Sequence, residues 1–300
     1  MNMTNNLAYF LGLWVAEGSF EEAIGRVSLT CGDREVLNPF VQHGICGLKF
    51  KYRRKDQIIL NSIEFMELMH FIGMPMCSAK FKFIPNWVFK GKKEWAECFI
   101  AGLFDGDGHV VSNNKAQRVG YTSSSKNLVV QLQKLLCNLG IISRVTFDHI
   151  TPPTQRVKVS SIGHRLTIQG QEINKLRAHL SLRIKRKQNA LNHYCFEGRN
   201  RSSRKDVIPH QSPLIDCLWK NRTKQRIRDG YLFSSPLSKY VSCVKTYKKG
   251  TGRNALNSFL NRMKNYILQT EENLNAYKSL KKNVESDIYW DEIVSIDVTK

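Results

Sequence analysis

Two similar ten-residue stretches, ninety positions apart, constrain the fold of this 300-residue chain most strongly. They run from Phe10 to Ser19 and from Ile100 to His109. In each, an apolar run typical of a helix carries two small residues four positions apart, then an acid, then a glycine that can end the helix. The small pairs are Gly12 with Ala16 and Gly102 with Gly106.

Small residues at positions i and i+4 share one helix face and let two helix backbones approach closely. We therefore expect the two stretches to pack against each other, which would bring Glu17 beside Asp107 at the two helix ends. Two carboxylates near two negative helix C-termini repel each other unless a cation lies between them. A hard cation that prefers oxygen ligands, such as magnesium, would relieve this repulsion.

The charge of the chain indicates its partner. Lys and Arg number 46 against 25 Asp and Glu, a net charge of +21. Such an excess favours nucleic acid over an anionic membrane, because no stretch approaches the roughly 18 apolar residues of a membrane span. The N-terminus lacks the basic start of a signal peptide, and the eight cysteines form no cluster with metal-ligand spacing. We expect an intracellular protein, cytoplasmic or nucleoid-associated, with no membrane partner.

The order of predicted elements occurs twice. After the first stretch, strands are expected at about 24–30, 49–53 and 57–60, and helices at about 34–43 and 61–72. After the second, strands are expected at about 118–122, 142–147 and 156–168, and a helix at 125–138. The chain is thus predicted to be α+β, with tandem αββαββα repeats over 1–92 and 93–198 related by pseudo-twofold symmetry.

The remaining residues, 199–300, are predicted to form a basic, mostly helical C-terminal extension. Helices are expected at 212–219, 237–246 and 254–277, where apolar residues recur at helical spacing. The β-branched and aromatic residues of 287–298 predict a strand.

The two stretches resemble the paired signature of the LAGLIDADG homing endonucleases, especially those encoded within inteins. Residues 99–108 match that signature almost letter for letter, and the first copy is looser. The lysine-containing segments 80–85 and 182–187 are similar to the segments that follow each repeat in that family. Residues 206–209 and 287–296 are similar to segments near the end of intein endonuclease regions. The sequence lacks an N-terminal Cys or Ser and a terminal His-Asn pair, so we expect an endonuclease without splicing blocks.

The resemblance implies a site-specific, metal-dependent endonuclease that hydrolyses phosphodiester bonds in both strands of DNA. Glu17 and Asp107, with Gly18 and Gly108, would form the magnesium site. Mn²⁺ is expected to substitute, and Ca²⁺ to bind without supporting cleavage. Lysines near each acid could polarise the attacking water or neutralise developing charge. The candidates are Lys82 and Lys187, with Lys80 and Lys185 as alternatives.

The implied partner is double-stranded DNA with a long, roughly pseudo-palindromic site, bound by a monomer and read by strands in the major groove. The candidate DNA-binding residues are Arg26, Ser28, Thr30, Lys49, Lys51 and Arg53 in the first repeat, Arg118, Thr122, Arg144, Arg156 and Lys158 in the second, and Arg183 and Lys185. The alternative is a non-cleaving nucleic-acid binder on the same scaffold, either an RNA maturase or a transcription regulator. The acid present in both stretches favours cleavage.

Overall fold

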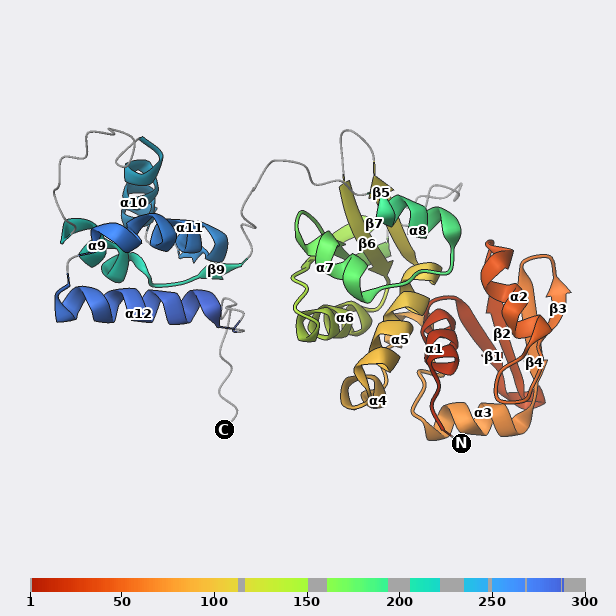
Figure 1. Ribbon diagram of the computed structural model, residues 1–300. Helices are drawn as coiled ribbons and strands as arrows, with labels where there is room; N and C mark the ends of the chain where they lie inside the picture. The colour runs from red at the N-terminus through yellow and green to blue at the C-terminus, as the bar shows by residue number, and fades with distance from the viewer. Residues whose placement is uncertain are drawn as a thin grey trace. The chain divides into compact units, whose positions relative to one another are not determined.

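The computed structural model describes residues 2–112, 117–150, 161–193, 206–221, 235–247, 250–267, 269–286 and 288. The chain divides into two compact units, Met1–Glu197 and Gly198–Lys300. The first unit combines helices with two four-stranded sheets, and the second is mostly helical (Figure 1). Within the described residues, no helix is long and apolar enough to span a bilayer.

The first unit contains the predicted pair of αββαββα repeats. The first repeat consists of α1 (Asn5–Glu17), β1 (Gly18–Glu21), β2 (Arg26–Thr30), α2 (Arg34–Gln42), β3 (Lys51–Arg54), β4 (Gln57–Asn61) and α3 (Ile63–Phe71). The second consists of α5 (Lys93–Gly106), β5 (Gly108–Ser112), β6 (Gln117–Ser123), α6 (Lys126–Asn138), β7 (Arg144–Ile150), β8 (Ser161–Ile168) and α7 (Glu172–His179). The antiparallel sheets have equivalent strand orders, β1-β2-β4-β3 and β5-β6-β8-β7. The predicted α+β fold class is confirmed.

Shorter elements follow each repeat. After the first come the 3₁₀ helix η2 (Ala79–Phe81) and α4 (Asn86–Lys90), and after the second comes α8 (Lys185–Asn192). The strand predicted at 24–30 begins later, at Arg26, because Glu22–Ile24 form the 3₁₀ helix η1 between β1 and β2. At four residues, β1 is too short for an alternating pattern to show in the sequence.

The two motif helices, α1 and α5, contact each other backbone to backbone, as the small residues predicted. A Cβ atom added to Gly12 would lie 2.0 Å from the main-chain oxygen of Phe99, and one added to Gly102 would lie 2.2 Å from that of Tyr9. A Cβ on Gly106 would lie 2.4 Å from the Cβ of Ala16. Since real Cβ atoms do not approach other atoms so closely, the glycines are what allow this contact.

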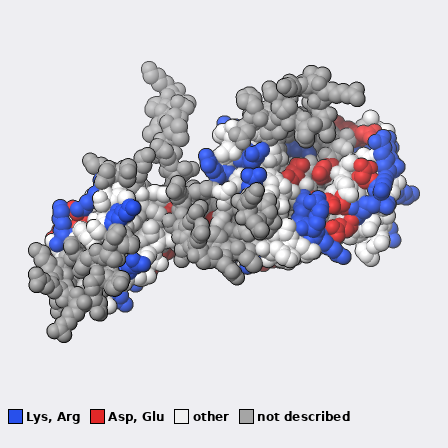
Figure 2. Space-filling model, turned by 90° about the horizontal axis from the view of Figure 1, so that it is seen from above, with Lys and Arg blue, Asp and Glu red and all other residues white. Residues whose placement is uncertain are grey.

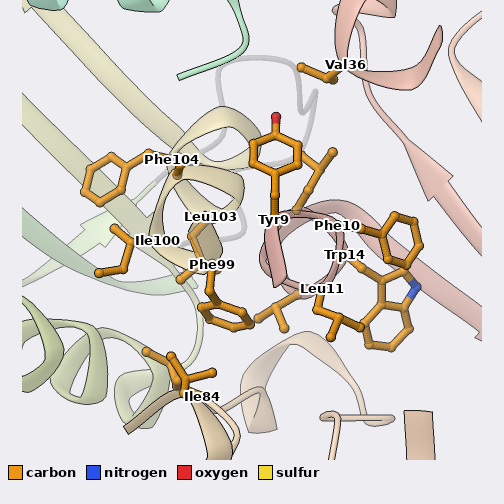
Figure 3. Close-up of a cluster of buried hydrophobic side chains, with 14 of the residues drawn as sticks. Tyr9, Phe10, Leu11, Trp14, Val36, Ile84, Phe99, Ile100, Leu103 and Phe104 are labelled. Carbon is orange, nitrogen blue, oxygen red and sulfur yellow. The ribbon is translucent and has the colours of Figure 1, made fainter. Parts of the chain in front are cut away.

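The large side chains of the motif helices project from the sides that face away from this contact. Phe10 and Trp14 project from α1 in one direction, and Ile100 and Phe104 project from α5 in the other (Figure 3). Phe10 packs edge-on against Phe40 of α2, with ring centroids 5.0 Å apart. Each motif helix therefore fills the core of its own repeat and presents its small residues to the other repeat.

The segments that follow each repeat cross to the other repeat in an equivalent way. The Ser125 hydroxyl, which caps α6 of the second repeat, donates to the main-chain oxygen of Lys82 at 2.6 Å. In the other direction, Arg186 of α8 forms an ion pair with Asp33, the residue before α2, at 2.8 Å. These reciprocal contacts hold both lysine-containing segments at the seam between the repeats.

The second unit has its own apolar core around Leu256, Phe259 and Leu260. Its elements are β9 (Val207–Ile208), α9 (Ser212–Lys220), α10 (Ser235–Tyr247), β10 (Thr251–Gly252), α11 (Arg253–Met263), η3 (Lys264–Tyr266) and α12 (Glu271–Glu285). The helix predicted over 254–277 is wrong in extent, because Thr270 caps a new helix by accepting from the Asn273 N–H. The strand predicted at 287–298 lies, apart from Ile288, outside the described residues.

Candidate active site at the helix seam

The two predicted acids lie at equivalent ends of the motif helices. Glu17 is the last residue of α1, and Asp107 directly follows α5, where its N–H donates to the main-chain oxygen of Leu103 at 3.1 Å. The helices are in contact here, since a Cβ on Gly106 would lie 3.1 Å from the Cγ of Glu17. The structure thus brings the two carboxyl groups to one end of the seam.

The pKa values of both acids are raised. Asp107 reaches solvent on one side, yet the protein around the carboxyl group and then the charge of Glu17 raise its pKa to about 6. Burial also raises the pKa of the half-buried Glu17. Lys82 and Lys187 act in the opposite direction on both acids. The pair therefore holds two negative charges only at a cost, which a cation would remove.

The side chains present fit a cation that keeps ligands from elsewhere. Within the described residues, no group of three or more His, Cys, Asp or Glu side chains converges. Two carboxylates, with water and substrate oxygens completing the shell, are a ligand set that magnesium accepts. Gly18 and Gly108, which start β1 and β5 directly after the acids, lie where main-chain oxygens could contribute.

Two buried lysines close the C-terminal ends of the motif helices. The Lys187 ammonium group donates to the main-chain oxygens of Phe104, Asp105 and Gly106 at 2.9, 2.7 and 3.1 Å. The Lys82 ammonium group donates equivalently in α1, to the oxygens of Val15 at 2.6 Å and Ala16 at 3.2 Å. Burial lowers the pKa of each lysine, and nearby carboxylates raise it.

The structure distinguishes within each pair of candidate lysines. Lys82 and Lys187 are 9% and 5% exposed and lie at the helix ends beside the acids. Lys80 and Lys185 are exposed to solvent and make no such contact. Because a cation is favourable at a helix C-terminus, the buried lysines stabilise the site electrostatically as well as geometrically.

Asp105 plays a part that the sequence did not reveal. Its carboxylate is 1% exposed and accepts hydrogen bonds from the Tyr9 hydroxyl at 2.7 Å, the Arg183 N–H at 2.7 Å and the Ile184 N–H at 3.3 Å. These contacts fix the start of α8, and hence the position of Lys187. Tyr9 is 96 residues away in the sequence, so no local pattern could identify it. Val15 occupies the equivalent position in α1 and is buried among apolar residues.

The sheet residues that lie next to the two acids differ between the repeats. The Tyr121 hydroxyl of β6 lies 3.5 Å from Oδ2 of Asp107 and is fully buried. Tyr121 pairs with Gly108, just as Leu29 pairs with Gly18 in the first repeat. Leu29 therefore stands where Tyr121 stands in the second repeat and offers no hydrogen bond to Glu17.

The first sheet turns several of its candidate DNA-binding residues away from the core. Strand register puts Arg26, Ser28, Thr30 and Lys51 on the face opposite to Val27, because side chains alternate along each strand. Ser28 is one of the predicted DNA-binding residues, but it is only 3% exposed and therefore not accessible to DNA. Lys49 is exposed but precedes β3, and the strand predicted from 49 is therefore wrong at its start.

Glu21 neutralises part of this face. Arg26 donates to Oε1 of Glu21 at 3.1 Å and to the side chain of Asn61 at 3.0 Å. Arg53 lies 3.7 Å from the same carboxylate. No pattern in the sequence predicts the pairing of Arg26 with Glu21, because it depends on the register of β1 against β2.

The second sheet presents Arg118, Thr122 and Arg144 on its open face, opposite to the buried Val119 and Tyr121. Arg165 of β8 pairs with Thr122 and joins this face. Arg156 and Lys158 lie outside the described residues.

Arg183 and Lys185 have local partners at the seam. The Arg183 guanidinium stacks 3.7 Å from the centroid of the Tyr9 ring and donates to Asn6 at 2.9 Å. The N–H of Lys185 donates to Glu35 at 3.0 Å, while its side chain is exposed. The structure therefore does not bring Arg183 onto the open strand faces.

Charged side chains are unevenly distributed over the surface of the first unit. Seen from above, Asp and Glu side chains gather between groups of Lys and Arg side chains (Figure 2).

Part of the chain is similar to a known protein family. Residues 94–180 match the family described as LAGLIDADG-like domain. The chain is 28% identical over 304 residues to DNA-directed RNA polymerase subunit Rpo1C of Methanocaldococcus jannaschii, an alignment that covers 97% of the chain and 32% of the relative. It is 27% identical over 152 residues to a DNA polymerase of Thermococcus sp., with coverage of 47% of the chain and 9% of the relative. The chain thus spans about a third or less of the length of these curated relatives.

Solved structures similar to the chain include homing endonuclease I-DmoI in complex with DNA and Ca, with 16% identity, a TM-score of 0.42 and coverage of 63% of this chain and 98% of that one. Full-length DUF199/WhiA from Thermatoga maritima matches with 12% identity, a TM-score of 0.39 and coverage of 96% and 93%.

Proposed function

We propose that this chain is a site-specific DNA endonuclease that hydrolyses phosphodiester bonds in both strands with a divalent metal ion. The observation that carries the proposal is the placement of Glu17 and Asp107 at one end of the helix seam, with the pKa of Asp107 raised to about 6. A raised pKa means that the position disfavours the ionised carboxylate, which brings no benefit to an ordinary surface acid. For a metal ligand the bound ion compensates for this cost. The family match over residues 94–180 includes Asp107 and supports the assignment.

Glu17 and Asp107, with Gly18 and Gly108, would hold Mg²⁺. When bound, the ion supplies a Lewis acid that lowers the pKa of a water molecule and offsets charge on the phosphate oxygens. The carboxylates of Glu17 and Asp107 would also orient a water molecule toward the phosphorus atom. Lys82 and Lys187 stabilise the negative charge that develops on the phosphate, because their ammonium groups are already fixed by main-chain oxygens and need no reorganisation. Mn²⁺ would replace Mg²⁺, and Ca²⁺ would bind without supporting cleavage.

The two sheets would bind double-stranded DNA, each covering one half of a long and roughly pseudo-palindromic site. Arg and Lys on open strand faces read guanine in the major groove, and the remaining basic residues contact phosphates. One chain carries both acids and both sheets, so a monomer suffices.

The curated relatives suggest how such a chain occurs in nature. They include components of an RNA polymerase, a ribonucleotide reductase and a DNA gyrase, as well as a DNA polymerase, and each shares between 9% and 32% of its length with this chain. A segment common to such different enzymes does not account for their individual reactions. We infer that the shared segment is an inserted module of the intein-encoded type, which acts on DNA rather than contributing to its host.

Cleavage of a randomised duplex library tests the function directly. Purified protein with Mg²⁺ is expected to cut a small set of related sequences across both strands, and Asp107→Asn is expected to leave them intact while still binding them. A protein that binds a duplex but cuts no member with Mg²⁺ or Mn²⁺ would instead support the non-cleaving alternative, a maturase or a transcription regulator. Equal cutting by wild type and Asp107→Asn would show that the acids are not the catalytic centre.

A further inference from the structure

Two helices of the second unit follow each other across a short turn. α10 ends at Tyr247 and α11 begins at Arg253, and the residues between them include Gly250 and Gly252. A Cβ on Gly250 would lie 2.4 Å from the main-chain oxygen of Ile208, so the turn packs tightly against β9. The two helices run in different directions (Figure 1). This arrangement resembles a helix-turn-helix, in which two helices meet at a steep angle across a short turn that often contains glycine.

Contacts with α10 and with the turn fix one side of α11. The Tyr240 ring of α10 packs against Phe259 of α11 with ring centroids 5.5 Å apart, and the Tyr240 hydroxyl shares a hydrogen bond with the Thr251 hydroxyl at 2.5 Å. Leu256 and Leu260 are buried together with Phe259. Residues at this spacing occupy one face of a helix, so the opposite face of α11 points to solvent.

The exposed face of α11 consists mainly of amide and hydroxyl side chains. Asn257, Ser258 and Asn261 are exposed, and Arg262 lies beside them. Among the described residues, the side chains of Asn257 and Asn261 have no hydrogen-bond partner. Asn is a poor helix former, because its side chain competes for hydrogen bonds with the helix backbone. This composition therefore lowers the stability of α11 and gives no structural contact in return.

The neighbouring helix α12 has the composition expected of a solvated face. Its exposed positions include Glu271, Lys278 and Lys281, and Lys281 forms an ion pair with Glu285 one turn later at 3.7 Å. Such charged residues favour helix formation and hydration. The two helices belong to the same unit, so the amides of α11 are not a general property of its surface.

The charge around α10 and α11 favours a polyanionic partner. Residues 230–270, which contain both helices, include seven Lys or Arg and no Asp or Glu. Arg262 is exposed, and none of the ion pairs found among the described residues involves it. A neutral amide face within a basic region is complementary to the base edges of a duplex between its two phosphate backbones.

We propose that α11 lies in the major groove of duplex DNA and reads adenine with Asn257 and Asn261, at base pairs additional to those contacted by the two sheets. An Asn side chain binds N6 and N7 of adenine with paired hydrogen bonds, and Ser258 can add a single one. Duplex RNA does not fit this face, because side chains cannot read its deep, narrow major groove. The proposal rests on the proposed function only in taking double-stranded DNA as the partner.

Binding of DNA by the full chain tests the proposal. A duplex is selected in Ca²⁺ from a library with a long randomised region. Asn257→Ala and Asn261→Ala are each expected to weaken binding of this duplex about tenfold, the loss of one paired contact to a base. The slope of log K against log salt should stay unchanged, because a base contact releases no counterions. Asn275→Ala, at an exposed position of α12, is the matched control and should bind as wild type does.

The substitutions are chosen so that the fold survives. Alanine is the best helix former, so the thermal midpoints of Asn257→Ala and Asn261→Ala should equal or exceed that of wild type. A duplex in which 7-deazaadenine replaces one contacted adenine lacks the N7 acceptor. This duplex should bind wild type less tightly, and combining it with the corresponding Asn→Ala variant should cost less affinity than the two separate losses together.

The outcomes separate the two proposals. If no duplex is selected, both fail. If a duplex is selected and cut with Mg²⁺, but Asn257→Ala and Asn261→Ala bind it as Asn275→Ala does, the role of α11 alone is overturned. If both variants bind weakly and wild type cuts no duplex with Mg²⁺ or Mn²⁺, the proposed function fails and the role of α11 stands. An equal loss of affinity for every duplex, whatever its sequence, would overturn the reading of bases.

Discussion

Lys82 and Lys187 cap the C-terminal ends of the two motif helices in the same way, although they are 105 residues apart in the sequence. The Lys82 ammonium group lies 2.6 Å from the main-chain oxygen of Val15, and that of Lys187 lies 2.7 Å from the oxygen of Asp105, the equivalent residue. Each lysine comes from the segment that follows its repeat and donates back to the motif helix of that same repeat. Other groups of the same two segments contact the other repeat, so the lysines lie where the repeats pack together.

Lys187→Met is expected to destabilise the first unit by about 2–3 kcal/mol, because three main-chain oxygens lose their buried donor and the helix end loses its cation. Urea unfolding measures the change. Lys185→Met, two residues away and exposed, is the matched control and should stay within about 0.5 kcal/mol of wild type. Comparable losses for both variants would contradict the capping role of Lys187.

Gly102→Ala is expected to cost about 3 kcal/mol or more, because the new Cβ would lie 2.2 Å from the main-chain oxygen of Tyr9 and 2.6 Å from the nitrogen of Leu13. Main-chain atoms of α1 cannot move aside without separating the helices. Gly32→Ala is the control, since a Cβ there meets nothing within 4 Å. Thermal unfolding compares them, and an unchanged midpoint for Gly102→Ala would contradict the backbone contact.

Asp107→Asn is expected to stabilise the metal-free protein at neutral pH. The folded pKa of Asp107, about 6, is above its ordinary value of 3.8, so the folded state binds protons more tightly than the unfolded state. The stability contributed by this group is therefore present below the unfolded pKa and lost as pH rises through about 6. Thermal midpoints at pH 7.5 should be higher for Asp107→Asn than for wild type, and the difference should shrink at pH 4. A lower midpoint at pH 7.5 would count against the raised pKa.

Magnesium is expected to reverse this cost. Added Mg²⁺ should raise the thermal midpoint of wild type at pH 7.5, and this increase should fall as pH drops through about 6, because a protonated Asp107 cannot serve as a ligand. Asp107→Asn should show little increase at either pH. Equal stabilisation of both proteins by Mg²⁺ would place the ion elsewhere.

Tyr121→Phe is expected to raise the pH at which stabilisation by Mg²⁺ is lost. The Tyr121 hydroxyl lies 3.5 Å from the Asp107 carboxylate and lowers its pKa, so removing it should raise the pKa of Asp107 further. The pH at which Mg²⁺ stabilisation falls to half should increase. Tyr52→Phe, which removes a hydroxyl bonded to Asn38 in the first sheet, is the control and should leave it unchanged.

Much of the fold could be predicted from the sequence because its signals are local. The helical runs, their small residues and the acids at their ends lie within ten residues of one another, and the same element order follows each. The prediction of the longest helix was less accurate. The apolar spacing that begins at Leu256 continues to Ile267, although α11 ends at Met263 and Thr270 starts a new helix. Apolar spacing shows which side of a segment is buried, not where the backbone turns.

The sequence by itself determined the two motif helices, their close contact and the two acids, because each depends on residues one or two helical turns apart. Only the tertiary structure decided which lysine of each pair reaches a helix end, what Asp105 binds, and that Arg26 pairs with Glu21. These features depend on strand register and on contacts between residues tens of positions apart. Small offsets there turn a side chain from one face to the other, and no local pattern encodes them.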